Sequence, residues 1–323
     1  MISFARALLW LAAIAALAAG AVGYYWSEEP APFNVIDQAI LEAEEIERPV
    51  VEGTATTAVV IHLVEVLLEK PGGFLANDRL PPGILMDDLP QWEYGVMVMV
   101  RDMTRALHDR IGRKQGYPED DDITIADARF RIAHDSRFLP DTGSEYQAGA
   151  EHLRDYLRRL SNTRNPGAQF DASPENLVLW LKMVEVRLDG LLQQLGSCVR
   201  EDAYGVATQA ANQEAAPVYA SWHQVDNIFF EARGSAWALS HLLQAVEIDF
   251  SRTLKKQEAR PHIARILREL EPAIAPLKSP VILNGGNYSI WANHPQVLAS
   301  YLFRARTEVV ALREKVELGV IAK

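Results

Sequence analysis

The first constraint on this chain is an uncharged run of twenty residues near its amino terminus, Ala7 to Trp26, which is rich in alanine and leucine. A helix of about twenty apolar residues covers the roughly 30 Å hydrocarbon core of a bilayer. The run therefore predicts a transmembrane helix, and the lipid bilayer is the first expected partner of the chain. No second uncharged run of this length follows, so we expect a single span.

The residues that flank this run predict its orientation. Arg6 and the amino terminus are positive on one side, Glu28 and Glu29 lie on the other, and aromatic residues fill positions 24–26 at the headgroup level. We therefore expect residues 1–6 in the cytoplasm and the body in the periplasm, with the anchor in the bacterial inner membrane. A cleaved signal peptide is the alternative, because the small alanine residues of the run suit a signal peptidase.

Charge and cysteine content argue against several classes of function. The formal net charge is −11, whereas a nucleic-acid-binding protein needs clustered Lys and Arg to neutralise phosphates. The single cysteine, Cys198, can form neither an intrachain disulfide nor a thiolate zinc site. Its place on an apolar helical stripe predicts burial rather than a dimer link. We expect no nucleic-acid partner and no cofactor.

Three long stripes of apolar residues, spaced alternately by three and four, determine the predicted fold of the body. They run over residues 177–198, 225–250 and 298–316. This spacing is typical of helices that pack in a heptad-like, slightly crossed arrangement. Ser173 followed by Pro174 is a good start for the first of these helices. The predicted fold is all-α: a single transmembrane helix followed by a bundle of long helices.

The chain divides into an anchor, a linker and one helical body. Two prolines make residues 27–33 a short, stiff linker. The periplasmic helical domain is expected over residues 34–323. A polar segment at 162–172 that contains Pro and Gly is the candidate boundary between two packed helical halves.

Two long segments without helical periodicity interrupt the body, at 71–90 and 277–295. Loops of this length in compact domains are uncommon and often functional. The alternative for the first segment is a strap packed over the bundle, because its apolar residues need burial: Phe74, Leu75, Ile84, Leu85 and Met86.

A predicted helix over 57–69 carries three polar residues on one stripe, His62, Glu65 and Glu69. Imidazole and carboxylate groups can bind a divalent metal. A di-iron bundle, however, pairs Glu-x-x-His motifs on two helices, whereas here the order is reversed and no second copy matches. We therefore predict no metal site and interpret the stripe as the solvent-facing edge of a buried helix.

A second line of side chains, on the predicted helix over 222–257, is the candidate binding face. It combines acidic, aromatic and basic residues: Asp226, Phe230, Glu231, Arg233, Trp237 and the flanking His241. An Arg beside a Trp can stack and still donate in a fixed fork to a carboxylate or phosphate. Gly234 in the same helix costs about 1 kcal/mol relative to Ala, which predicts close approach of another backbone. The alternative is an internal ion-pair network between helices.

The sequence contains no G-x-S-x-G elbow, no H-E-x-x-H zinc-protease motif and no phosphate-binding loop. The leading hypothesis is therefore a non-enzymatic envelope scaffold that binds a protein partner through the candidate binding face. An envelope hydrolase or transferase that uses Glu65 or Asp226 with His62 or His223 is the alternative. A binder of lipid or another apolar ligand is the second alternative.

Several stretches of the body, taken together, resemble one protein family. They are Lys70-Pro71-Gly72-Gly73-Phe74, Trp92-Glu93-Tyr94-Gly95, Val100-Arg101-Asp102-Met103, Phe230-Glu231-Ala232-Arg233-Gly234 and Ala292-Asn293-His294. The chain after the anchor is similar, over nearly its whole length, to a proteobacterial family known as domain of unknown function 2333. This resemblance implies a single amino-terminal membrane segment and a mostly helical body. It implies no activity, cofactor or catalytic residue.

Overall fold

The protein is all-α, as the sequence predicts. The computed structural model describes residues 2–78, 80–114, 116–134, 141–162, 167–198, 222–277, 282–283 and 292–321. Within these ranges every regular element is a helix. The notation α is used for α-helices and η for short turns of other helical types.

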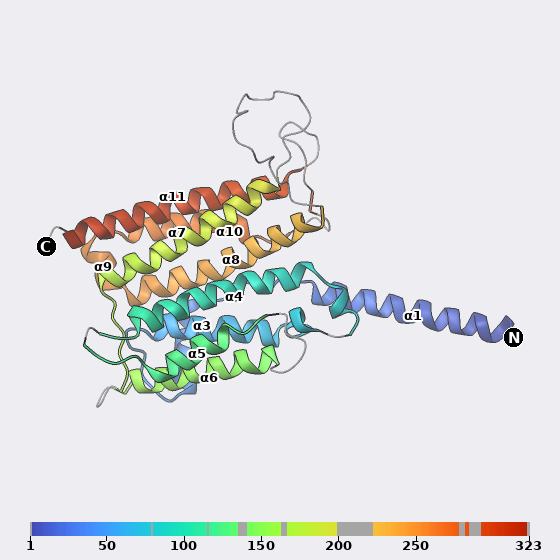
Figure 1. Cartoon of the computed structure of the whole chain (residues 1–323), viewed down its shortest axis with the longest axis horizontal. Coiled ribbons are helices and arrows are strands. Elements are labelled where there is room, and N and C mark those ends of the chain that lie inside the picture. The colour runs from blue at the N-terminus through green and yellow to red at the C-terminus, as the bar shows by residue number, and fades with distance from the viewer. Residues whose placement is uncertain are drawn as a thin grey trace, which may run out of the picture.

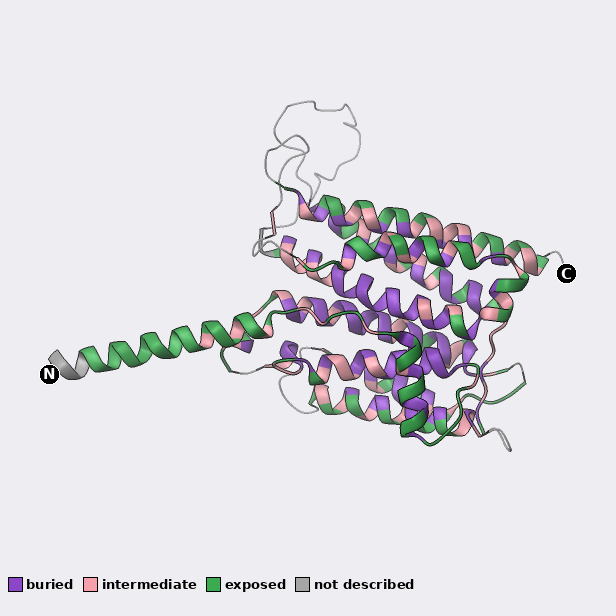
Figure 2. Cartoon of the chain, turned by 180° about the vertical axis from the view of Figure 1, so that it is seen from behind, coloured by how far each residue is buried: buried purple, intermediate pink, exposed green. Residues whose placement is uncertain are grey.

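Helix α1 (Ile2–Trp26) extends away from the rest of the molecule (Figure 1). Its segment Arg6–Trp26 has a mean hydropathy of 2.0 and is not buried in the protein. Figure 2 shows it exposed along its length, in contrast to the buried positions of the central helices. By length and composition α1 can cross a membrane, and an amino-terminal signal sequence meets the same criterion.

The body is built from helices of very different length. The elements are α2 (Val35–Glu45), α3 (Thr54–Glu69), η1 (Leu75–Asn77), η2 (Gly83–Leu85), α4 (Asp88–Ala106), the π-helical turn η3 (Leu107–Ile111), α5 (Asp121–Phe130), α6 (Thr142–Leu160), α7 (Pro174–Ser197), α8 (Trp222–Asp249), α9 (Ser251–Lys256), α10 (Arg260–Ile274) and α11 (His294–Ile321).

Helices α4 and α8 form the centre of the bundle. Helices α3, α5 and α6 lie on one side of this pair, and α7, α10 and α11 lie on the other (Figure 1). A Cβ atom added at Gly95 would lie 2.1 Å from the carbonyl oxygen of Glu231, and one added at Gly234 would lie 2.0 Å from that of Trp92. Two glycines therefore let these backbones touch, which confirms the close approach predicted from Gly234.

The apolar stripes predicted for α7, α8 and α11 are buried, and Cys198 at the end of the first is buried as well. Helices α7 and α11 pack on one another, but α8 packs mainly on α4. Helix α8 meets α4 through residues outside its stripe, Glu231, Gly234 and Ser235, so its main partner differs from the one that heptad spacing alone indicates. The reason is the glycine contact, which brings α4 closer to α8 than larger side chains would allow.

Some boundaries differ from those expected. Helix α4 begins at Asp88, eight residues before the periodic pattern starts at Val96, because Pro90 is tolerated in a first helical turn. The amphipathic helix α10 was not predicted at all.

The predicted boundary at 162–172 lies partly outside the described residues, since 163–166 are not among them. Of the remainder, Phe170 packs on Phe250, and the N–H of Asp171 donates to the carbonyl of Ile111 at 2.7 Å. The segment at 277–295 also lies mostly outside the described residues.

Candidate functional site

The candidate binding face on α8 divides into two regions. Arg233, Trp237 and His241 are buried, whereas Asp226, Phe230 and Glu231 are partly exposed, and of these Glu231 leaves a different side of the helix. We call the first set, with the residues that cover it, the closed face. The second region, a cavity beside Glu231, is called the open groove.

Arg233 is the centre of the closed face, and its guanidinium is fully engaged. Its Nε and Nη2 donate to the two carboxylate oxygens of Glu29, at 2.8 and 2.6 Å. Its Nη1 and Nη2 also donate to the carbonyls of Ala273 and Ala275, at 3.0 and 2.9 Å. These carbonyls lie at the carboxyl end of α10, where a cation is favoured by unpaired acceptors and the helix dipole. Arg233 thus joins α8, α10 and the segment that follows α1.

His241 holds the same segment about two helical turns further along α8. The backbone N–H of Phe33 donates to its Nε2 at 3.1 Å, and its Nδ1 lies 2.7 Å from the carbonyl of Trp237. The Nδ1 nitrogen must therefore carry the proton, since Nε2 is an acceptor. The ring of Phe33 stacks on the imidazole with centroids 4.0 Å apart. Burial lowers the pKa of His241 to about 4, so the ring is neutral at pH 7.

The predicted polar stripe on α3 is divided between the interior and the surface. His62 meets the edge of Phe33 with ring centroids 4.4 Å apart and lies 3.5 Å from Glu65. Glu65 also accepts from the buried Arg154 of α6, and only Glu69 is exposed. The first two residues are half-buried because α6 and the segment after α1 cover this part of α3.

These contacts define what the closed face can do chemically. Phe33 lies between His62 and His241, and the buried His241 has no room for a reactant against it. The carboxylate that the Arg233 fork was predicted to bind comes from the chain itself. Neither Glu29 nor Phe33 is expected at the site from the sequence. The only available signal was an acidic and an aromatic residue directly after the anchor.

The open groove is a cavity of about 490 Å³ between α4, α7 and α8. Helix α7 supplies most of its wall, α4 supplies Asp102, and α8 supplies Glu231. Glu231 is therefore the one member of the candidate binding face that lines this cavity. The lining is apolar over much of its area and carries charged side chains beside Glu231 and Asp102.

A second apolar stripe on α7 forms the wall of the groove. Leu179, Met183, Val186 and Gly190 follow one another in steps of four, three and four, parallel to the buried stripe of the same helix. Unlike the buried stripe, this one faces outward: Leu179 is 40% and Val186 is 72% exposed. At Gly190 an added Cβ would meet no atom within 4 Å. The stripe has the spacing of a helix-packing surface and is open to solvent.

Among the described residues, the charges of the groove are paired except at Glu231. Arg187 donates from Nε and Nη2 to the two oxygens of Asp102, at 2.9 and 3.1 Å, and Lys182 lies 3.3 Å from Glu317. Within the described part of the chain, the carboxylate of Glu231 has no hydrogen-bonded or ion-paired partner. Burial raises the pKa of this carboxyl, and the charge of Arg187 opposes the shift. Glu231 is thus an unpaired acceptor in a half-buried position.

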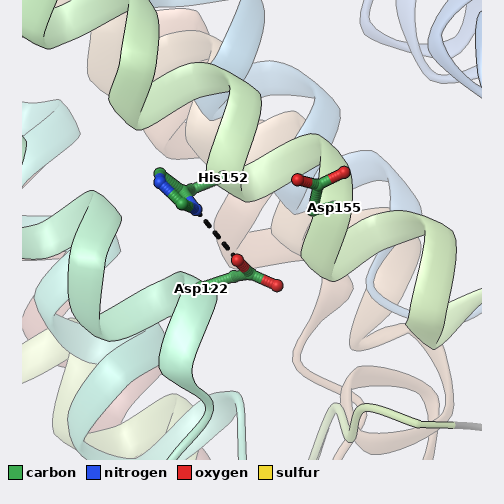
Figure 3. Close-up of side chains that lie close together, drawn as sticks. All are labelled: Asp122, His152 and Asp155. Atoms are coloured by element: carbon green, nitrogen blue, oxygen red, sulfur yellow. Dashed lines mark hydrogen bonds and ion pairs between the residues drawn. The ribbon is translucent and has the colours of Figure 1, made fainter.

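A third cluster combines metal-ligand types but is an ion-pair network. Asp122 of α5 and His152 and Asp155 of α6 bring one potential ligand atom each within 4.8 Å of the others (Figure 3). Asp122 bonds His152 at 2.9 Å and Arg159 at 2.5 Å, and Asp155 bonds Arg158 at 2.5 Å. A cation would have to displace two arginines, so the cluster is better suited to joining α5 and α6.

The fold and the two regions of α8 define a class of protein: an all-helical bundle with an amino-terminal apolar helix long enough to cross a membrane. A family model described as an uncharacterized protein conserved in bacteria, DUF2333, matches residues 3–319. The chain belongs to this family, which confirms the resemblance seen in the sequence. Searches of curated proteins and of solved structures gave no match.

Proposed function

We propose that this protein is a membrane-tethered scaffold of the bacterial envelope that binds a helix of a partner protein in the open groove. Helix α1 anchors it in the inner membrane as a single pass, with the amino terminus in the cytoplasm and the body in the periplasm. The observation that carries the proposal is the exposed apolar stripe of α7, which runs beside the carboxylate of Glu231, a group without a bonded partner among the described residues.

The chemistry of the groove indicates the kind of helix that fits. Anchor residues at positions i, i+4 and i+7 of an amphipathic helix would pack between Leu179, Met183 and Val186. The bare backbone at Gly190 leaves room for a close helix crossing. Because Lys182 and Arg187 already have acidic partners, the free charge of the groove is negative. A Lys or Arg of the bound helix would pair with Glu231, so we propose an amphipathic, basic partner helix.

The closed face is the weaker candidate for partner binding. A partner that used Arg233 or Trp237 would first have to displace Glu29 and Phe33, which belong to the protein itself. The envelope hydrolase or transferase alternative gains no support from Glu65 or His62, because Arg154 and Phe33 occupy them. The His223 side chain of that alternative lies outside the described side chains.

Site-specific photocrosslinking in native membranes tests the proposal. A photoreactive amino acid replaces Val186 in the groove or, as a matched control, Phe303 of α11, which is also exposed and apolar. We expect a discrete adduct at position 186 only, with the crosslinked partner peptide containing Lys or Arg beside apolar residues. The adduct should be lost in the variant Glu231→Lys. Equal adducts at both positions, or an adduct at 186 that survives Glu231→Lys, would overturn the proposal.

The topology is tested separately with a membrane-impermeant thiol reagent added to intact spheroplasts. Leu318→Cys in a Cys198→Ala background should react from outside, because residue 318 is exposed on the body. A cysteine placed at Ser3 should react only after lysis. The reverse pattern would place the body in the cytoplasm.

A further inference from the structure

The loop between α3 and α4 exposes large apolar side chains at its tip. Leu80, which precedes η2, and Leu85, the last residue of η2, are 75% and 77% exposed, and Ile84 is also exposed. Earlier in the same loop, Phe74 and Leu75 are buried. The strap interpretation thus accounts for the first part of the loop but not for its tip.

The tip is exposed although the loop has a well-defined shape. The buried carboxylate of Glu93 accepts the backbone N–H groups of Leu75 and Ala76, each at 2.9 Å, and pairs with Lys70 at 2.6 Å. Nearer the tip, the Asp78 side chain lies directly over Gly83, where an added Cβ would be 1.8 Å from its Oδ2 atom. A buried, fully engaged carboxylate and a close side-chain contact therefore hold the loop in this shape.

The loop also touches the end of α1. A Cβ atom added at Gly23 would lie 3.4 Å from the Cβ of Pro82, and one added at Gly72 would lie 2.7 Å from the ring of Trp26. Gly23 is three residues before Trp26, which corresponds to about 4.5 Å along a helix axis. If Trp26 marks the headgroup level, Pro82 lies at the level of the last apolar turn. Figure 1 shows the loop at the end of the bundle from which α1 emerges.

We infer that residues 80–86 form a second membrane contact, in which Leu80, Ile84 and Leu85 enter the interface of the leaflet that faces the body. This inference rests on the proposed role of α1 as a transmembrane anchor. Apolar side chains held beside a lipid-facing helix at this depth are removed from water by the bilayer itself. Together with the ion pair between Glu29 and Arg233, the contact sets the orientation of the bundle relative to the bilayer.

The contact is apolar rather than electrostatic. Asp87 follows the tip directly and is exposed, and the chain carries a net charge of −11. Anionic lipids attract basic segments and give no advantage to an acidic one. The expected occupant is therefore the hydrocarbon and headgroup boundary of any fluid bilayer, and binding should not strengthen when anionic lipid is added.

Depth-dependent fluorescence quenching of the full-length protein in phosphatidylcholine vesicles tests this inference. Single cysteines carry an environment-sensitive dye in a Cys198→Ala background: Leu85→Cys or Leu80→Cys at the tip, Leu17→Cys within α1, and Leu318→Cys as the exposed apolar control on α11. We expect lipids with a quencher near the headgroup to quench the tip positions several-fold more than position 318. The tip dyes should also show blue-shifted emission.

Each outcome separates the loop contact from the anchor. Quenching at position 17 with equal quenching at 85 and 318 would overturn the loop contact and leave the anchor intact. No lipid quenching at position 17 would overturn both. A tip dye protected from the lipid quencher and from aqueous iodide would show that protein covers the tip, which also contradicts the inference. Vesicles with added anionic lipid should give unchanged quenching at the tip.

Discussion

Two charged residues of α8, Glu231 and Arg233, illustrate how differently the closed face and the open groove are built. Two positions along an α-helix correspond to a turn of about 200°, so their side chains leave opposite sides of the helix. Arg233 enters the interior, where a carboxylate and two helix-end carbonyls satisfy it. Glu231 enters a solvent-filled groove, where it has a nearby cation but no bonded partner among the described residues.

The difference teaches where a helical bundle of this kind has room for a ligand. A buried charge must be paired within the protein, because an unpaired one would be prohibitively costly. A half-buried charge can lack a protein partner at low cost in free energy, because water still solvates it when no ligand is bound. Burial therefore marks the closed face as structural, and the unpaired state of Glu231 marks the groove as the binding region.

Substitution of Arg233 by Ala should destabilise the protein by about 3–5 kcal/mol, the usual loss when one partner of a buried ion pair is removed. Glu29 and the two carbonyls at the end of α10 would lose their donor. Urea unfolding of the detergent-solubilised full-length protein, followed by circular dichroism, measures the change. Arg252→Ala is the matched control, because Arg252 is 88% exposed on its side chain and should change stability by less than about 0.5 kcal/mol. Equal effects at both positions would mean that Arg233 does not make these buried contacts in solution.

Acidification should open the closed face through His241. Its pKa is about 4 in the folded protein against an ordinary 6.5, so the unfolded chain binds the proton more readily. The contribution of neutral His241 to the free energy of unfolding is therefore present in full above pH 6.5 and is lost as the pH falls towards 4. The full difference is about 3 kcal/mol.

The measurement for His241 is the free energy of unfolding between pH 4 and 7 for the natural protein and for His241→Gln. The difference between the two proteins should shrink as the pH falls, since only the natural one loses a pH-dependent contribution from this position. The buried carboxyl of Asp249, whose pKa is raised to about 6, changes stability in the opposite direction but cancels in the difference. A difference that is constant with pH would show that His241 is not held neutral by burial.

Replacing Arg187 by Ala in the groove should cost only about 1 kcal/mol or less, although its contact with Asp102 is also bidentate. The side chains of Arg187 and Asp102 are 37% and 20% exposed, so water weakens their attraction and solvates whichever remains. The same unfolding assay compares this variant directly with Arg233→Ala. A loss as large as that of Arg233→Ala would place Arg187 in the structural core and remove the contrast between the two regions.

The sequence predicted the all-α fold, because burial of an apolar stripe leaves a local periodic pattern along each helix. It also predicted the glycine contact at Gly234, since a helix-interior glycine is unfavourable without a packing reason. It did not predict the closed face, because Glu29 and Arg233 are 204 residues apart and no local pattern relates them. The groove was present in the sequence as the stripe from Leu179 to Gly190. Periodicity alone does not reveal which of two stripes on one helix is covered.

The smallest effect on stability is expected at Glu231, and there it should oppose the effect on binding. Burial raises the pKa of this carboxyl above 4.5, so the stability it contributes is present at low pH and is lost as the pH rises through the folded value. Glu231→Gln removes this loss and should leave the protein equally stable or slightly more stable at pH 7, within about 0.5 kcal/mol.

The same variant should weaken crosslinking at position 186, because a neutral amide cannot pair with a basic helix. Two residues away, Arg233→Ala should instead lower the free energy of unfolding by about 3–5 kcal/mol. A loss of stability in Arg233→Ala together with a loss of binding in Glu231→Gln would show that one residue maintains the fold and the other recognises the partner. A Glu231→Gln variant that crosslinks like the natural protein would contradict the proposed specificity of the groove.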